Sequence, residues 1–340
     1  SPLASLLGRW PRYEGIPTLG LYVAMFFVGA KILGGKATAG NWQTLRLSLA
    51  AAAVLLLALS GFEAVGLRPI GGAVGDRTGA TLGNATDQGL IGVVIAGVLS
   101  APFGKSAGRG KWLTVLGLAS AVAIVLLSAS RAALAALAIV AITATVVQFT
   151  ARQGRKLTVV LGLAGAVVAV GASALLIPPM RARLFSAETV DGRSMLWNRT
   201  LGLVKDHQWT GVGPSGFVDA FPAYVDQSWA QTVGDRFPTD SPHSWPLQLL
   251  VAGGAPLLIA ALVCAGLFIR SALARIAQAA EPAGKQQLIV VLAAVCAYAV
   301  ALLTHFSSPG TTGLVAFLGG GLVAIEQNGR NRQGGVLGLA

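Results

Sequence analysis

The feature that most constrains this chain is a series of apolar blocks, each about long enough to cross a lipid bilayer as a helix. A helix needs roughly 20 apolar residues to span the hydrocarbon core. Nine such blocks can be read, and they cover about 15–33, 42–61, 87–103, 112–129, 132–150, 157–177, 245–269, 287–305 and 311–325. The chain is 54% apolar and only 11% charged, so it lacks the polar surface that a soluble domain of this length requires. The sequence predicts an all-α fold, a polytopic membrane helix bundle of about nine spans.

The short connections between these blocks hold many of the basic residues, and these connections fall on one side if the spans alternate. Segments 104–111 and 151–156 contain lysine and arginine but no acidic residue, and 270–285 has three basic residues against Glu281 alone. By the positive-inside rule this side is cytoplasmic. Topology thus accounts for the net charge of +12, and we expect no nucleic-acid partner.

The opposite, external side receives the only large hydrophilic segment, residues 178–244, with six basic and seven acidic residues. We expect three parts. These are N-terminal transmembrane helices over 1–177, an external (periplasmic) loop with an amphipathic helix over 178–244, and C-terminal transmembrane helices with a cytoplasmic tail over 245–340. Nine spans with a cytoplasmic C-terminus place Ser1 outside, so we expect further spans upstream of it.

Arg131 is the first candidate for binding an anion on the external side. It stands in "LSASRAALAAL", between two apolar blocks, and follows Ser128 and Ser130. Arginine at a membrane edge can be an anchor whose head reaches the interface. An outward-facing guanidinium can also bind a phosphate through its forked donors. Both interpretations fit the sequence around Arg131.

Arg193 is the second candidate. The spacing of apolar residues in "DGRSMLWNRTLGLVKD" predicts a helix on the membrane surface, with Asp191 as its N-cap. Arg193 and Trp197 are four residues apart and therefore share a face of this helix. The guanidinium can pack over the indole or bind an anion, and the stretch by itself favours neither.

His243 lies in "FPTDSPHSWPLQLLVAGGAP", where the hydrophilic loop meets an apolar block. A histidine in this place can simply begin a helix. Imidazole, however, is a proton acceptor near neutral pH, and two candidate anion-binding arginines lie on the same side. A transferase needs a base for its hydroxyl acceptor and cations for a diphosphate leaving group, so His243 is a candidate base.

Other kinds of active site have no signature in the sequence. It contains no paired-histidine zinc motif, no phosphate-binding glycine loop and no nucleophile elbow. Cys264 and Cys296 lie inside apolar blocks, where core packing explains them, and neither His207 nor His305 is flanked by recognisable metal ligands. We therefore expect no metal and no cofactor.

Taken in order, several fragments resemble the O-antigen ligase and polymerase family of membrane glycosyltransferases. They are the outward-facing "SRAALAAL", the external "GRSMLWNRTLGLVKDHQWTGVGPSGF" and the membrane-edge "HSWPLQLLVAGGAPLL". The upstream "GDRTGATLGNATDQG", which contains Arg77, is similar to the segment before an early span in that family. The likeness runs from about Arg77 to Leu257.

The resemblance implies a reaction and a set of residues. In such ligases a glycan on undecaprenyl diphosphate in the outer leaflet passes to an acceptor hydroxyl, and attack opposite the leaving group inverts the anomeric carbon. Arg131 and Arg193 match the family's arginines and would hold the donor diphosphate, whereas His243 matches its histidine and would accept the hydroxyl proton. Arg77 and Asp240 are further candidates, for a second phosphate contact and for orienting His243.

The expected partners are an undecaprenyl-diphosphate-linked glycan donor, a glycolipid or glycan acceptor such as lipid A-core, and membrane lipids. The site would face the periplasm or cell exterior from the plasma (inner) membrane. Trp197 and Trp245 could stack on sugar or polyprenyl, although an interfacial tryptophan also serves as an anchor.

Two alternatives remain. Ser244 follows the histidine where the family commonly has Asn, and Ala252 occupies the place of a Glu. These departures leave a polymerase of the same family, which joins lipid-linked repeat units, as the alternative to a ligase. From another class, a transporter or flippase for a lipid-linked glycan would have ionisable or helix-breaking residues at mid-span depth. Few charges lie there.

Overall fold

The computed structural model describes residues 7–8, 15–34, 38–68, 78–79, 82–101, 109–150, 181, 188–233 and 239–324. Within these ranges all regular secondary structure is helical, as predicted. The helices are α2 (Ile16–Leu33), α3 (Thr38–Ala64), α4 (Ala85–Ser100), α5 (Arg109–Leu127), α6 (Arg131–Thr150), α9 (Glu188–Asp206), α10 (Phe217–Ala220), η2 (Phe221–Tyr224), α11 (Gln227–Thr232), α12 (Trp245–Gln278), α13 (Pro282–Ala301) and α14 (Pro309–Val323).

Six of these helices, α2, α3, α5, α6, α12 and α13, are long and apolar enough to cross a membrane, and α4 and α14 are shorter apolar helices. The predicted polytopic bundle is confirmed, with eight of the nine predicted blocks forming helices close to their expected positions. The remaining block, 157–177, lies outside the described residues.

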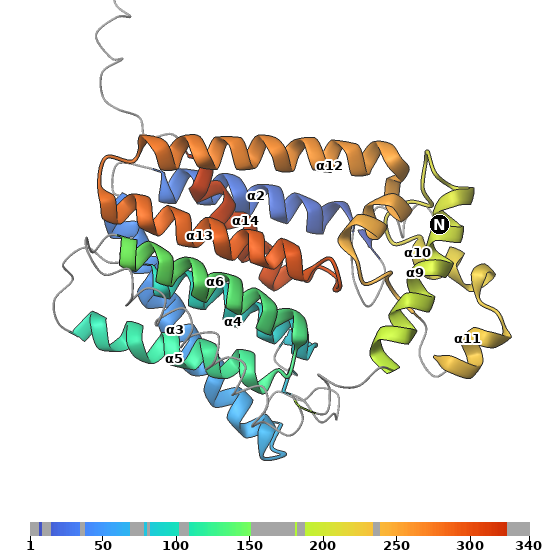
Figure 1. Cartoon of the computed structure of the whole chain (residues 1–340), viewed down its shortest axis with the longest axis horizontal. Coiled ribbons are helices and arrows are strands. Elements are labelled where there is room, and N and C mark those ends of the chain that lie inside the picture. The colour runs from blue at the N-terminus through green and yellow to red at the C-terminus, as the bar shows by residue number, and fades with distance from the viewer. Residues whose placement is uncertain are drawn as a thin grey trace, which may run out of the picture.

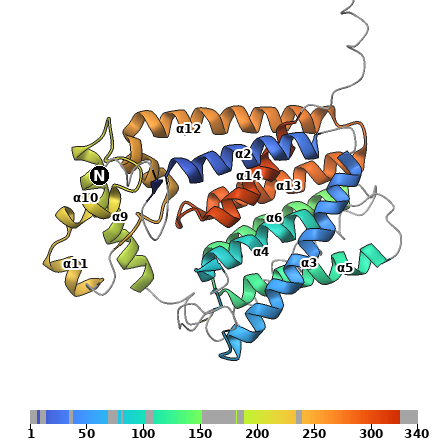
Figure 2. The same ribbon diagram turned by 180° about the vertical axis from the view of Figure 1, so that it is seen from behind.

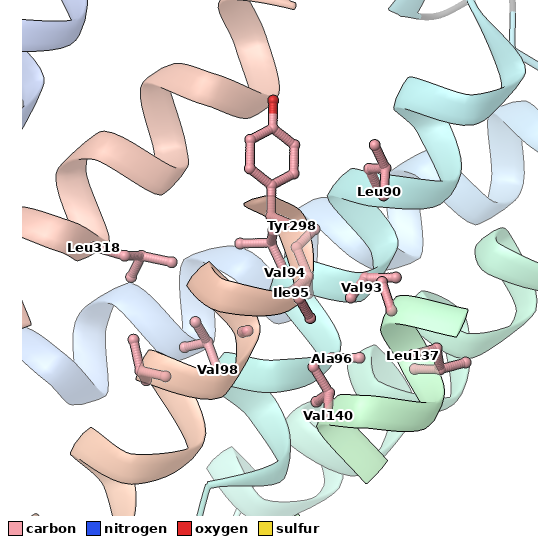
Figure 3. Packing of buried hydrophobic residues seen from close by; sticks show 14 of the residues in the cluster. Leu90, Val93, Val94, Ile95, Ala96, Val98, Leu137, Val140, Tyr298 and Leu318 are labelled. Atoms are coloured by element: carbon pink, nitrogen blue, oxygen red, sulfur yellow. The ribbon is translucent and has the colours of Figure 1, made fainter. Parts of the chain in front are cut away.

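The core of the bundle is built around α4. This helix is apolar on all sides and is buried along most of its length against α5, α6 and α13, as a helix without a polar face must be. Figure 3 shows its side chains meeting those of α6, α13 and α14; the labelled residues are Leu90, Val93, Val94, Ile95, Ala96, Val98, Leu137, Val140, Tyr298 and Leu318.

The helices alternate in direction, so that corresponding ends gather on two faces of the bundle. The N-terminal ends of α2, α4, α6, α12 and α14 lie toward α9, α10 and α11, together with the C-terminal ends of α3, α5 and α13 (Figures 1 and 2). We call this the α9 end. The helix ends on the opposite side carry basic residues of the predicted cytoplasmic connections, which are Lys31 and Arg275 in the last turns of α2 and α12 and Lys111 and Lys285 in the first turns of α5 and α13. The expected separation of these residues from the 178–244 loop is therefore present in the fold.

The structure corrects two details of the sequence prediction. With Asp191 as its N-cap, α9 is expected to begin at Gly192; it begins four residues earlier, at Glu188, so Asp191 lies in its first turn and is not its N-cap. Acidic residues are favoured at both positions, because both lie near the positive end of the helix dipole. The span expected over 245–269 is longer, ending at Gln278, and it is interrupted at Gly253 and Gly254.

Candidate functional site

Residues 188–233 form a small unit with its own apolar core at the α9 end. One face of α9 packs against the short helices that follow it and against the first turns of α12; the buried residues are Leu196, Leu203, Phe217, Phe221, Trp229 and Val251. The apolar stripe that predicted this helix is therefore directed into this core. As a result, α9 is held against the beginning of α12 (Figure 1).

Two glycines break α12 close to its start. Gly253 has φ −149° and ψ 18°, and Gly254 has φ 67° and ψ −166°, a combination that only glycine adopts without strain. The helical hydrogen bond between Val251 C=O and Ala255 N–H is replaced by bonds to another segment. Residues 245–252 thus form a short helical segment that is separate from the long span after the break.

The turn that follows α9 supplies the missing partners. Val212 N–H donates to Val251 C=O (2.7 Å), and Ala255 N–H donates to Gln208 C=O (2.8 Å). Backbone groups released by a helix break need such partners when water is scarce. We call residues 208–212 and 251–255 the α9–α12 seam.

His243 lies immediately before the first segment of α12, and its backbone is unusual. Its φ is +49°, one of three positive values at non-glycine residues in the described chain. Such a conformation costs of order 1–3 kcal/mol and is concentrated at functional sites. The Ser241 hydroxyl fixes this turn, since its Oγ accepts from His243 N–H (3.1 Å) and lies 3.3 Å from Nδ1 of the ring.

Trp197 joins α9 to the His243 turn. Its indole N–H donates to Pro242 C=O at 3.0 Å, so the α9 face that it shares with Arg193 is directed toward this turn. Arg193 is half-buried, one helical turn before Trp197. The structure therefore places the predicted Arg193 face and the predicted His243 at the same junction.

Charged residues elsewhere on α9 and the short helices pair with one another. Arg199 forms an ion pair with Asp226, and hydrogen bonds from Ser228 and from Trp229 N–H lower the pKa of that carboxyl. On the same unit, the hydrogen bond to Asp206 raises the pKa of the Tyr224 phenol. Arg199 thus has a structural role and serves below as a control for Arg193.

Arg131 is the first residue of α6, at the α9 end. The preceding Ser130 caps the helix by accepting from Ala133 N–H (3.3 Å). This N-terminus packs directly on α4, because a Cβ on Gly89 would lie 2.4 Å from the Ser128 hydroxyl and 2.7 Å from the Ala133 methyl group. Arg131 therefore begins its helix beside the first turn of α4.

The first turn of α4 contains a buried acid that the sequence analysis did not single out. Asp87 Oδ1 lies 3.5 Å from Nε2 of His305, and the two side chains are 2% and 5% exposed. The His305 ring lies nearly parallel to that of His243, with centroids 6.3 Å apart. Asp87 and His305 both stand at predicted external ends of predicted spans, and this shared position is the sequence signal that could have identified them.

Two other predicted site residues are less well defined. Asp240 is half-buried and lies three residues before His243. Arg77 lies outside the described residues. Trp245 connects the site to the segment after α13, since its backbone N–H donates to Leu302 C=O (3.0 Å).

The site therefore combines a proton acceptor with two guanidinium-bearing helices around one end of a membrane bundle. In the described part of the chain no three His, Cys, Asp or Glu side chains are grouped as a metal site would require. An arrangement of imidazole and guanidinium can bind an oxyanion and move a proton.

Comparison with protein-family models gives a match. The O-antigen ligase family model matches residues 115–262, a range that contains Arg131, Arg193, His243 and the break in α12. No curated protein matches the sequence of the chain. The match confirms the resemblance predicted from the sequence: residues 115–262 of this chain are similar to the O-antigen ligase family.

Proposed function

We propose that this protein transfers a glycan from undecaprenyl diphosphate to an acceptor hydroxyl at the external face of the plasma membrane. The observation that carries the proposal is the strained His243 at the membrane edge, joined through Pro242 and Trp197 to the face of α9 that holds Arg193. The ligase-like family of residues 115–262 supports the same reaction class.

In the proposed reaction, the acceptor oxygen attacks the anomeric carbon of the donor glycan and gives its proton to His243. The bond between that carbon and the diphosphate oxygen breaks, and undecaprenyl diphosphate leaves with the electron pair. Because Ser241 Oγ lies at Nδ1 of the ring, we assign Nε2 as the proton acceptor. Attack from the face opposite the diphosphate inverts the anomeric centre.

Arg131 and Arg193 would hold the diphosphate and stabilise the charge that develops on it. Planar guanidinium groups match phosphate oxygens through two parallel hydrogen bonds, and such pairs are about twice as strong as neutral hydrogen bonds. Preorganised cations of this kind lower the barrier because they need no rearrangement as charge develops. We propose Arg77 for a second phosphate contact and Asp240 for orienting the His243 turn.

The orientation of the protein follows from charge. The end opposite α9 holds Lys31, Lys111, Arg275 and Lys285, so we propose that it faces the cytoplasm. The α9 end then lies in the periplasm or outside the cell, at the headgroup level of the outer leaflet. A lipid-linked donor presents its diphosphate at this depth.

The acceptor separates a ligase from a polymerase. We propose a glycolipid such as lipid A-core as the first candidate acceptor, and a second lipid-linked repeat unit as the alternative. The decisive assay uses purified protein in lipid nanodiscs with labelled lipid-linked glycan and either acceptor. Release of undecaprenyl diphosphate with a glycosylated glycolipid supports the ligase, and lengthened lipid-linked glycan supports the polymerase.

A transporter for lipid-linked glycan is less consistent with the fold. The buried Arg46 of α3 donates to Leu99 C=O and Ala101 C=O (3.0 Å each), and so satisfies the last carbonyl groups of α4. The break in α12 is satisfied by the turn after α9. The buried guanidinium of Arg46 and the backbone groups at the break in α12 therefore have hydrogen-bond partners within the protein, and no transported substrate is needed to explain them. Translocation of the donor without its cleavage in the same nanodiscs would overturn the transferase proposal.

A further inference from the structure

We infer that His305, held by Asp87, is a positioning residue for His243. This inference rests on the proposed function, in which His243 is the base. The pair joins the start of α4 to the segment between α13 and α14, with Asp87 Oδ1 and His305 Nε2 3.5 Å apart.

Stability alone is a poor explanation for this pair. Burying a carboxylate and an imidazole has a desolvation cost, and replacing a buried ionic pair with apolar residues of similar volume is often neutral or stabilising. Both side chains are nonetheless almost completely buried, and the His305 ring lies nearly parallel to that of His243. A buried polar pair in this setting points to a geometric role.

The geometry identifies the residue that the pair supports. The His243 and His305 rings are inclined by only 15°, and Phe306 lies beside both, with centroids 5.2 Å from His243 and 3.9 Å from His305. The ring of His243 thus packs against residues 305–306, while Ser241 Oγ lies at its Nδ1. Fixing His305 through Asp87 fixes the surface on which the His243 ring rests.

His305 acts through His243 and does not itself contact the substrate. Its side chain is only 5% exposed, and its Nε2 is directed at Asp87. A general base must lie within hydrogen-bond distance of the proton that it accepts, and a displacement of about 1 Å can reduce the rate about 100-fold. Loss of the pair should therefore reduce turnover, whereas donor binding, which the arginines provide, should be unchanged.

The test compares Asp87→Leu, His305→Leu and the double variant in the nanodisc assay, with kcat, donor KM and thermal stability measured for each. Either single variant leaves one buried polar partner and should lower stability. The double variant removes both polar groups and should regain most of the thermal stability that the single variants lose. We expect kcat to stay about 10- to 100-fold below wild type in the double variant, with donor KM unchanged.

The control is the neighbouring buried pair, in which Gln88 Nε2 donates to Ser60 Oγ. Gln88 lies in the same turn of α4 as Asp87, and Ser60 lies on α3. The double variant Gln88→Leu/Ser60→Ala removes the polar contact between them and should keep the wild-type kcat. Wild-type kcat in a stable Asp87→Leu/His305→Leu variant would overturn the inference and leave the proposed function intact. No glycan transfer by the wild-type protein with either acceptor would instead overturn the proposed function, and the inference with it.

Discussion

The α9–α12 seam makes the sharpest structural prediction, through Gly254→Ala. Gly254 has φ 67° and ψ −166°, a region that alanine enters at a cost of about 1–3 kcal/mol. A Cβ at this position would also lie 2.6 Å from Gln208 O and from Trp209 C. Backbone atoms cannot move aside as a flexible side chain can, so the turn after α9 must be displaced.

Displacement of this turn breaks the two seam hydrogen bonds. Each contributes about 1 kcal/mol net. Together with the backbone strain, we expect Gly254→Ala to cost about 3–5 kcal/mol. For a chain of this size, such a cost lowers the thermal midpoint by about 4–7 °C.

The matched control is Gly266→Ala in the same helix. Nothing lies within 4 Å of a Cβ built on Gly266, and alanine is favoured over glycine in a helix by up to about 1 kcal/mol. This variant should be as stable as wild type or slightly more stable. The measurement is thermal unfolding of both purified proteins in one detergent, followed by transfer activity.

Gly211→Ala provides a second test from the other side of the seam. Its φ is +64°, and a Cβ there would lie 2.5 Å from Val251 O. Because both changes open one seam, the double variant with Gly254→Ala should cost less than the sum of the single changes. Equal midpoints for Gly254→Ala and Gly266→Ala would refute the idea that the turn after α9 holds the break.

Three further predictions concern the site. Arg193→Lys should lose most turnover, because an ammonium group lacks the planar fork, whereas Arg199→Lys on the same helix should retain it; equal activities would show that Arg193 is only an anchor. His243→Ala and His243→Gly should both lose about 100- to 10,000-fold in kcat and keep donor binding, but glycine should be the more stable by about 1 kcal/mol because it relieves the positive φ. A metal chelator should leave transfer unchanged, and activity that is lost with chelator and restored by a divalent ion would contradict the proposed mechanism.

Much of the fold could be predicted because membrane helices are determined locally. The block that became α4 has no polar face after its first turn, and a helix of this composition must be buried in a core or in a membrane. The amphipathic stripe of α9 predicted a helix in the external loop for the same reason. Its exact start at Glu188 was missed because acidic residues are favoured both at the N-cap and in the first turn.

The break in α12 could not be predicted, because its cause is distant in the sequence. Two glycines within an apolar run weaken a helix only modestly, and hydropathy reads the run as one span. The break is stable because Gln208 and Val212 supply hydrogen bonds from a turn that precedes it by some 40 residues. The contact between Asp87 and His305 could not be predicted for a similar reason, since the two residues come together only after α4 and α13 have packed.

These non-local contacts explain how α9 can be positioned accurately against His243. Trp197 fastens the middle of α9 to Pro242, and the seam fastens the turn after α9 to residues 251–255. Positions 197 and 206, the last of α9, are about 14 Å apart at the rise of an α-helix, so two separated attachments hold α9 along the 242–255 segment. Two attachments prevent the helix from turning about its axis, and this rotation would move Arg193 relative to His243. The α9 unit is thereby tied to the span that begins just after the catalytic candidate His243, and the face of α9 that holds Arg193 is oriented by the same backbone contacts that interrupt this span.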